Sequence, residues 1–336
     1  MSHSTMRVAV ITDVRQVELR EVPKPQPGAG EALVKIKACG LCTWEQRTYS
    51  GMDKETPRPF AGGHEFAGVV EAIGDGTQTD LKVGDQVAVG ARPVGKHDLN
   101  RYQLEYSGLW GPMGLSEYMA IPVGRAYRLV PDLPLEEGCF AEPLACAVHA
   151  ANKIDLGLGE DVVVIGAGPM GMLNMMLAKR RGAHVIVSEI DPERNDRALE
   201  LGADFTVNPK TEDAPQRVRE LTGGKGADVV IIAIGNQAAN LDALKMVAEF
   251  GTVMFFASAH PATDLAIDPN FIHRKQVTLT GARHPSVEGF ETSTALLSKR
   301  LIDVRPLIHK KVPLDNIKEA FELANRPDTY RVIVTM

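Results

Sequence analysis

The feature that most constrains this 336-residue sequence is the segment Val162–Gly171, which reads Val-Val-Val-Ile-Gly-Ala-Gly-Pro-Met-Gly. Its four β-branched residues predict a strand buried on both faces. The glycines follow in the spacing GxGxxG, which permits a tight turn, a close approach of the backbone to a pyrophosphate, and close packing of the next helix on the strand. The first N–H groups of that helix would face the phosphates. The segment therefore predicts a dinucleotide-binding turn made by Gly166, Gly168, Pro169, Met170 and Gly171.

The stretch after this turn favours NAD as the dinucleotide. A second strand, His184–Ser188, leads to Glu189, which lies about twenty residues beyond the glycines. An acidic side chain at that place accepts hydrogen bonds from ribose hydroxyls and repels a 2′-phosphate, so we expect NAD rather than NADP. Two alternatives stay open: Glu189 is an acidic strand end that faces water, or Arg194 tolerates a phosphate. We expect both residues in the cofactor site.

Composition narrows the class of protein. With 43 acidic and 37 basic residues the net charge is −6, and no long basic run indicates a nucleic-acid surface. No apolar run reaches the length of a membrane span, and Met1–Thr5 lacks the layout of a signal peptide. Four cysteines are too few for a disulfide framework in a chain of this length. We therefore expect a cytoplasmic protein that binds neither nucleic acid nor membrane.

Two patterns divide the chain into two domains. Residues 6–144 carry short β-branched runs broken by Pro, Gly and Asp, and contain an aperiodic stretch, Ala91–Ser116, that predicts a long functional or mobile loop. A helical pattern over 138–153 leads into alternating strands and helices, which predict an α/β doubly wound parallel sheet. We expect its six strands at 161–165, 184–188, 205–207, 228–233, 252–257 and 277–280. Because these complete the sheet, we expect residues 1–146 and 285–336 to form one domain and 147–284 the other.

A second group of residues carries metal-binding chemistry. Thiol, imidazole and carboxylate groups come from three separate places, namely Cys39, Cys42, His64, Glu65 and Glu142. A catalytic zinc takes three protein ligands of these kinds and keeps one position for water or substrate. From the residues alone, two alternatives stay open: the Cys-x-x-Cys pair is redox-active or buried, and the His-Glu pair is structural.

Several motifs follow one another in an order that is specific to one family. They are Ala38–Cys42, Gly63–Val70, Val83–Val87, Ala141–Leu144, Val164–Gly171 and Lys311–Met336. Together they resemble the medium-chain zinc-dependent alcohol and polyol dehydrogenases, most of all the sorbitol and threonine dehydrogenase branch. The resemblance implies a GroES-like catalytic domain built from both ends of the chain, with a Rossmann domain between them. It also implies one catalytic zinc on Cys42, His64, Glu65 and Glu142, with Cys39 a buried neighbour. No structural zinc is expected, because Ala91–Leu115 has no cysteine.

One departure from the family concerns the proton relay. Where the family has a hydroxyl residue two positions after the metal cysteine and often a histidine five positions after it, this chain has Trp44 and Arg47. An indole N–H only donates, and a guanidinium does not release its proton at working pH. Thr43 and Glu45 flank the relay position. The routes left open are toward Glu65 or Glu142, or through the cofactor ribose. Trp44 either lines the substrate pocket or is a core aromatic.

The resemblance implies an NAD-dependent zinc oxidoreductase that takes hydride from a secondary alcohol on a polyol, sugar or cyclitol. One alternative is a redox-neutral epimerase or lyase that oxidises its substrate transiently, which the altered relay motivates. Another is a non-catalytic nucleotide-binding protein, against which the intact ligand set argues. The apolar strand pair at 255–257 and 277–280 makes a homodimer or homotetramer plausible.

Overall fold

The computed structural model describes residues 5–90 and 108–336, which form two compact units. Unit 1 comprises Met1–Ala145 with Ser286–Met336, and unit 2 comprises Cys146–Pro285. The predicted domain boundaries differ from these bounds by one residue at each junction. Within the described ranges, no helix has the length and apolar character that crossing a membrane requires.

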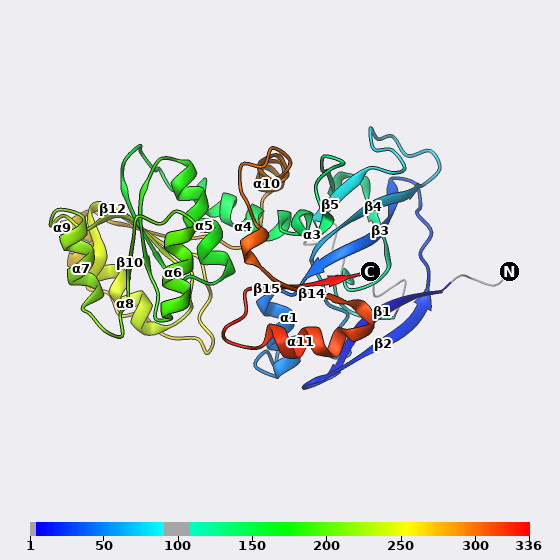
Figure 1. Ribbon diagram of the computed structural model, residues 1–336, viewed down its shortest axis with the longest axis horizontal. Coiled ribbons are helices and arrows are strands. Elements are labelled where there is room, and N and C mark those ends of the chain that lie inside the picture. The colour runs from blue at the N-terminus through cyan, green and yellow to red at the C-terminus, as the bar shows by residue number, and fades with distance from the viewer. Residues whose placement is uncertain (1–4, 91–107) are drawn as a thin grey trace. The chain divides into compact units, whose positions relative to one another are not determined.

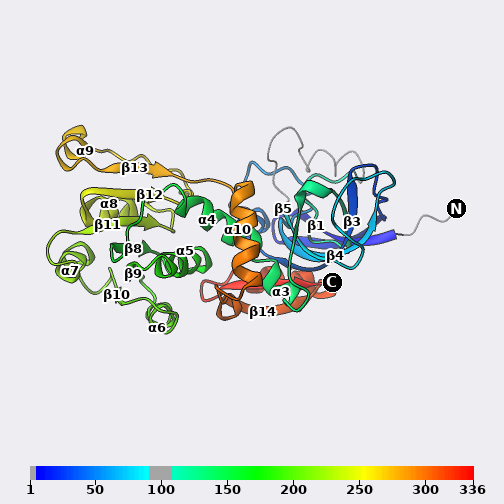
Figure 2. The ribbon, with the colours of Figure 1, turned by 90° about the horizontal axis from the view of Figure 1, so that it is seen from above.

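Unit 2 contains a six-stranded parallel sheet with helices on both faces (Figures 1 and 2). The strand order is β10-β9-β8-β11-β12-β13, so the predicted doubly wound sheet is confirmed. The strands are β8 (Asp161–Ile165), β9 (His184–Ser188), β10 (Phe205–Val207), β11 (Ala227–Ile232), β12 (Val247–Phe255) and β13 (Thr278–Gly281). The helices are α5 (Pro169–Arg180), α6 (Pro192–Glu200), α7 (Ala214–Leu221), α8 (Gln237–Met246) and α9 (Pro269–Lys275).

Unit 1 is built on a seven-stranded sheet and a separate hairpin. The sheet order is β14-β15-β3-β4-β5-β7, with β6 paired to β3. Strand β1 pairs with β2 and also makes isolated bridges from Val8 to Ser116 and from Ile11 to Phe60. The strands are β1 (Thr5–Asp13), β2 (Gln16–Pro23), β3 (Glu31–Gly40), β4 (Glu65–Ile73), β5 (Gln86–Gly90), β6 (Tyr118–Pro122), β7 (Ala126–Arg128), β14 (Ile308–Pro313) and β15 (Arg331–Thr335). The helices are α1 (Thr43–Ser50), α3 (Leu135–Gly138), α4 (Ala141–Ala151, which continues into unit 2), α10 (Val287–Ser298) and α11 (Ile317–Ala324).

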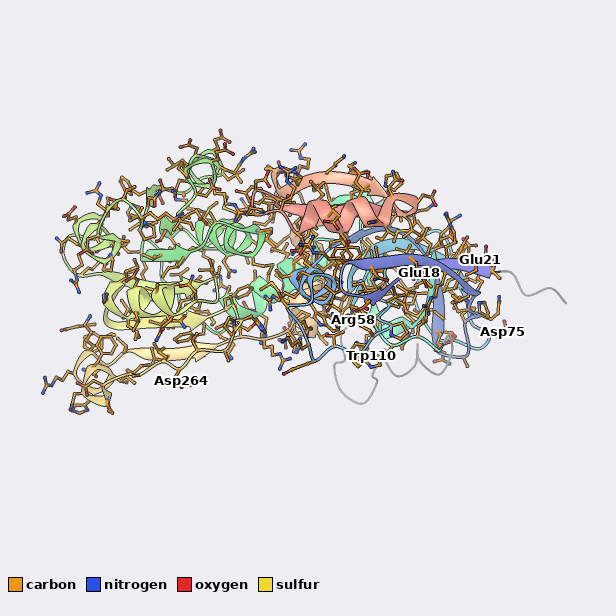
Figure 3. All side chains as sticks on the ribbon, turned by 90° about the horizontal axis from the view of Figure 1, so that it is seen from below. Glu18, Glu21, Arg58, Asp75, Trp110 and Asp264 are labelled. Carbon is orange, nitrogen blue, oxygen red and sulfur yellow. The ribbon has the colours of Figure 1, made fainter. Side chains whose placement is uncertain are left out.

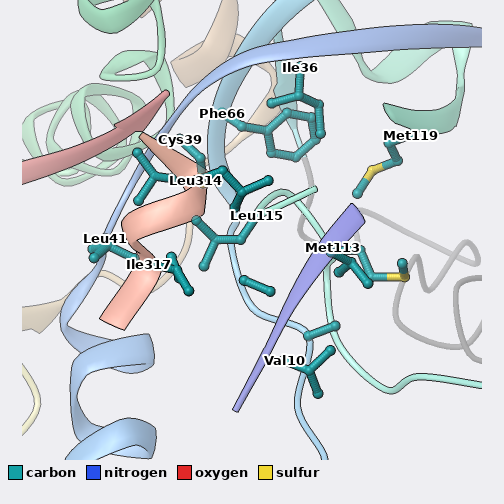
Figure 4. Packing of buried hydrophobic residues seen from close by; sticks show 14 of the residues in the cluster. Val10, Ile36, Cys39, Leu41, Phe66, Met113, Leu115, Met119, Leu314 and Ile317 are labelled. Carbon is teal, nitrogen blue, oxygen red and sulfur yellow. The ribbon is translucent and has the colours of Figure 1, made fainter. Parts of the chain in front are cut away.

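The two ends of the chain share one core in unit 1. Strand β15 pairs antiparallel with β3, with Val334 opposite Cys39. Figure 4 shows Leu314 and Ile317, from the C-terminal segment, packed among Val10, Cys39 and other apolar side chains of the first part of the chain. The thiol of Cys39 is fully buried there, and burial raises its pKa well above the usual value. Cys39 is thus a core residue rather than a solvent-facing thiol.

Besides shifts of one residue in β11 and β13, the structure differs from the sequence expectations at three elements. Helix α1 was not predicted, because it is short and its amphipathic pattern is weak. The helix predicted over 138–153 is the shorter α4, and a separate short helix, α3, precedes it. Pro143 lies in the first turn of α4, where its missing N–H costs nothing. Strand β12 begins at Val247 rather than at 252, because the chain leaves α8 directly in an extended conformation. Of the predicted loop and the cysteine-free stretch after Gly90, residues 91–107 lie outside the described part of the chain.

Candidate functional site

Three of the four predicted metal ligands converge in unit 1. The ligand atoms of Cys42, His64 and Glu65 all lie within 4.8 Å of one another. The sheet register explains this, because Gly40 at the end of β3 pairs with Glu65 at the start of β4. Cys42 lies two residues after β3 and directly before α1, and His64 directly precedes β4. One thiol, one imidazole and one carboxylate at this separation are the donor set of a catalytic zinc with a position left open.

A buried carboxylate orients the imidazole in this group. Glu45, on α1, is fully buried, and its Oε1 accepts hydrogen bonds from His64 Nδ1 at 2.8 Å and from the Gly63 N–H at 2.9 Å. Burial disfavours the charged form of Glu45, but His64 outweighs this and holds the pKa of Glu45 below its usual value. Since Nδ1 donates to Glu45, Nε2 is the nitrogen available to a metal.

From the sequence alone, Glu45 is only a flank of the relay position, and its contact with His64 is not predicted. The signal was available as an acidic residue three positions after Cys42, but only a helix at 43–50 turns that spacing into a contact. Carboxylates that receive the second nitrogen of a metal-binding histidine fix its tautomer and ring orientation.

An arginine from the last strand completes the surroundings of Glu65. Arg331, at the start of β15, is buried; its Nη2 lies 3.0 Å from Glu65 Oε1, and its Nη1 donates to the Leu41 carbonyl at 3.0 Å. Burial raises the pKa of Glu65 above its usual value, the charge of Arg331 opposes this, and that of Glu142 reinforces it. Sequence reasoning missed Arg331, because nothing local in the motif Tyr-Arg-Val connects it to residue 65.

Glu142 lies near the predicted ligands without joining them. It is in the first turn of α4 and is 5% exposed. Among the described residues, the group whose ligand atoms are within mutual reach contains Cys42, His64 and Glu65 but not Glu142. Its charge nevertheless acts on both Glu65 and Arg331. The geometry therefore places Glu142 around the three-residue group rather than within it.

Trp44 is oriented by hydrogen bonds that exclude it as a proton relay. Its Nε1 donates to Thr56 Oγ1 at 2.8 Å and to Asp53 Oδ2 at 3.1 Å. The indole ring lies 5.6 Å from the His64 ring, centroid to centroid. The hydroxyl of Thr43, the first residue of α1, lies with its Oγ1 3.9 Å from the Cys42 sulfur, and Thr43 is exposed.

In unit 2, the glycine-rich turn joins β8 to α5 as expected. Gly166 has φ +99°, and a Cβ on Gly171 would lie 1.8 Å from the Gly166 carbonyl oxygen, so both positions need glycine. A Cβ on Gly168 would meet only the Arg194 guanidinium, at 3.6 Å. Packing within the protein therefore does not require glycine at position 168, and the space beside it suits a bound ligand. Pro169 and Met170 are the first two residues of α5.

Glu189 anchors this turn. Its Oε2 accepts the Ala167 N–H at 2.7 Å, and its Oε1 accepts the N–H groups of Ile190 at 2.7 Å and Asp191 at 3.0 Å. The side chain is 8% exposed. It therefore does not simply face water. The carboxylate is bonded to the phosphate-binding turn itself, while Arg194, on α6, approaches the same turn from the next helix.

Comparison with known proteins gives a consistent result for both units. Residues 28–132 match the alcohol dehydrogenase GroES-like domain, and residues 169–299 match the zinc-binding dehydrogenase domain. The chain is 33% identical to the L-threonine 3-dehydrogenase of Pyrococcus horikoshii, over 94% of each chain. It is 29% identical to the L-galactonate-5-dehydrogenase of Escherichia coli, over 99% of each.

A solved structure agrees with these matches. The 2R,3R-butanediol dehydrogenase of Bacillus subtilis superposes with a TM-score of 0.85 at 27% identity, covering 98% of this chain and 99% of that one. Together with the three-ligand group and the dinucleotide-binding turn, these matches show that the chain belongs to the medium-chain zinc-dependent alcohol and polyol dehydrogenases, which are enzymes that use zinc and a nicotinamide cofactor.

Proposed function

We propose that this enzyme oxidises a secondary alcohol of a polyol, sugar or cyclitol, with NAD as the hydride acceptor. The observation that carries the proposal is the convergence of Cys42, His64 and Glu65 within 4.8 Å. The names of the relatives support the substrate class, because position 3 of threonine, position 5 of galactonate and the hydroxyl carbons of 2,3-butanediol are all secondary alcohols.

Each residue of the site has a distinct task in this proposal. When bound, zinc supplies Lewis acidity that lowers the pKa of an alcohol hydroxyl, and the nicotinamide supplies a hydride acceptor. Cys42, His64 and Glu65 hold the metal. Glu45 keeps the His64 ring in one tautomer and orientation, and Arg331 fixes the Glu65 carboxylate. The substrate proton leaves by a route that does not use Trp44, whose N–H can only donate.

The screen that tests this proposal uses zinc-loaded protein, NAD, and a set of polyols, sugar acids and cyclitols. Formation of reduced cofactor in proportion to oxidised product supports it. Bound zinc without any reduced cofactor would contradict it. Substrate conversion without net reduction of NAD would instead support the redox-neutral epimerase or lyase, which the fixed indole at the usual relay position favours as second candidate.

The preference for NAD is tested separately at Glu189. Replacing Glu189 by serine removes the negative charge near the ribose, so kcat/KM with NADP relative to NAD should rise by roughly tenfold. The matched control is Glu193→Gln, an exposed carboxylate on α6. An unchanged cofactor ratio in Glu189→Ser would assign the discrimination to another residue.

We also propose a cytoplasmic homodimer or homotetramer. The four cysteines are all free, as suits a reducing compartment, and β13 is an edge strand of the described sheet in unit 2. Light scattering of the purified protein should give two or four times the monomer mass. A monomer at micromolar concentration would refute this part.

A further inference from the structure

We propose that Trp44 is the specificity-determining wall of the alcohol site, and that Asp53 and Thr56 are positioning residues that act through it. The inference deepens the proposed function and rests on it for the identity of the reaction. The substrate presents a face of C–H groups to the indole while its reacting hydroxyl lies toward the metal ligands.

The first observation is an aromatic cluster beside the metal ligands. The Trp44 ring lies 5.1 Å from Phe60, 5.6 Å from His64 and 6.2 Å from Trp110, with Trp110 edge-on at 88°. Phe60 and Trp110 are 5.5 Å apart and are joined by a backbone bridge. Figure 3 labels Trp110 on the outer part of unit 1. Phe60 and His64 are buried, whereas Trp44 and Trp110 are partly exposed.

The second observation is that the indole is fixed by the segment that follows α1. Thr56 Oγ1 accepts the Trp44 N–H and in turn donates to Asp53 Oδ2 at 2.6 Å. The other oxygen, Asp53 Oδ1, accepts the N–H groups of Glu55 at 2.9 Å and Thr56 at 3.2 Å. Arg58 closes the segment by donating to the Thr48 carbonyl at 2.5 Å.

Two side chains, those of Asp53 and Thr56, accept the single N–H of the Trp44 indole. A Trp packed only as a core residue would need one acceptor for that N–H, but here both a carboxylate and a hydroxyl define the ring plane. Burial disfavours the charge of Asp53, yet the hydrogen bonds from Thr56, the backbone and Trp44 hold its pKa below the usual value. Asp53 therefore remains a charged acceptor, and the indole keeps one orientation next to His64.

The chemistry of the wall selects a class of substrate. An indole face packs against the C–H groups of a sugar, cyclitol or extended polyol, and its N–H is already used, so it offers no hydrogen bond to a substrate hydroxyl. A small alcohol without such a face gains little from it. Trp44 should thus contribute to kcat/KM for hydroxylated chains and rings but not for 2-propanol.

Positioning is tested without any turnover. In a Trp110→Phe background, Trp44 is the only tryptophan of the chain, so its emission and its quenching by acrylamide report its environment. With zinc content unchanged, Asp53→Ala and Thr56→Val should shift the emission to the red and increase quenching, and Asp53→Asn should restore much of the wild-type signal. The control is Glu55→Gln, an exposed carboxylate close to Asp53 in sequence. Identical emission and quenching in all variants would overturn the positioning role.

Selectivity is tested with sorbitol, galactonate and myo-inositol against 2-propanol, all with NAD. In Trp44→Ala, the ratio of kcat/KM for the best polyhydroxylated substrate to that for 2-propanol should fall by roughly tenfold, mainly through KM. Asp53→Ala should lower the same ratio in the same direction. A ratio that stays at the wild-type value in Trp44→Ala would overturn the wall. If no variant and no wild-type protein reduces NAD with any of these compounds, the proposed function fails, while the fluorescence result still decides the positioning role.

Discussion

The two units build their functional regions in opposite ways. In unit 2 the glycine-rich turn lies within ten consecutive residues and depends on the backbone: Gly166 supplies a positive φ, and Gly171 lies against the Gly166 carbonyl. In unit 1 the predicted metal-binding group takes its side chains from two segments, Cys42 after β3 and His64 with Glu65 at the start of β4, and Arg331 on β15 supports it from a third. These segments meet because β15, β3 and β4 are neighbours in one sheet. We therefore expect the glycine-rich turn to keep its conformation when distant residues are substituted. The geometry of the metal-binding group should change when any of the contributing segments is altered.

The largest expected effect concerns the two cysteines of the Cys-x-x-Cys pair. Cys42→Ser should lose bound zinc and reduce the rate of NAD reduction by about a thousandfold or more, because the metal stabilises transition-state charge by several kcal/mol. Cys39→Ala should keep its zinc, since the Cys39 thiol is buried in the core. Elemental analysis measures the zinc content of each variant, and the absorbance of reduced cofactor measures its rate of NAD reduction. Zinc loss in Cys39→Ala but not in Cys42→Ser would reverse the assignment.

The next largest effect tests whether Glu45 contributes to zinc binding through its hydrogen bond to His64. Glu45→Ala removes the acceptor of His64 Nδ1, so zinc affinity should fall about 10- to 100-fold, the usual consequence of losing such a partner. Competition with a chelator measures the change. Glu45→Asp should be intermediate, because a shorter carboxylate can still face the ring. Wild-type affinity in Glu45→Ala would show that the sheet alone positions His64.

A pair of glycine variants tests the glycine-rich turn between β8 and α5. Gly171→Ala should destabilise the protein by about 2 kcal/mol, because its Cβ would overlap the Gly166 carbonyl and force the turn apart. Gly168→Ala should leave the free energy of unfolding nearly unchanged, since its Cβ meets only Arg194, but should raise KM for NAD. Urea unfolding and cofactor titration separate the two. Equal loss of stability in both variants would show that Gly168 is also a packing position.

The smallest effect concerns acid stability of unit 2. Asp204 accepts Lys179 Nζ at 2.7 Å and the Val185 N–H at 2.7 Å; burial disfavours its charge, but these hydrogen bonds hold its pKa below the usual value. Because the folded pKa is the lower one, the stabilisation is present above the unfolded pKa of about 3.9 and is lost as pH falls through the folded pKa.

Asp204→Asn should therefore lower stability at pH 7 by less than about 1 kcal/mol and flatten its fall below about pH 4. Exposed Asp196→Asn is the control. Urea titrations at both pH values provide the measurement, and an unchanged acid slope in Asp204→Asn would contradict the role of this carboxylate.

The same contrast explains what could be predicted from the sequence. The bounds of β8 and β9 and the three glycines follow from local pattern, because each needs only its own neighbours. Residue chemistry indicates a metal site among Cys42, His64 and Glu65, and the family resemblance is what selects Cys42 over Cys39. Glu45 and Arg331 could not be joined to them, since their contacts depend on an unpredicted helix and on a strand far along the chain. Similarly, the orientation of the Trp44 indole could not be predicted, because it depends on hydrogen bonds to Asp53 and Thr56.

The position of Arg331 in the chain also determines when the surroundings of Glu65 can form during synthesis. The segments that carry Cys42, His64 and Glu65 leave the ribosome early, and unit 2 follows as one continuous stretch that can fold as it appears. Strand β15, which carries the Arg331 guanidinium, is synthesised after both of these regions. Until then the edge of β3 has no partner on that side and the buried carboxylate of Glu65 has no counter-charge from Arg331. A chain truncated before residue 331 would contain Cys42, His64 and Glu65 yet lack the strand that pairs with β3 beside them.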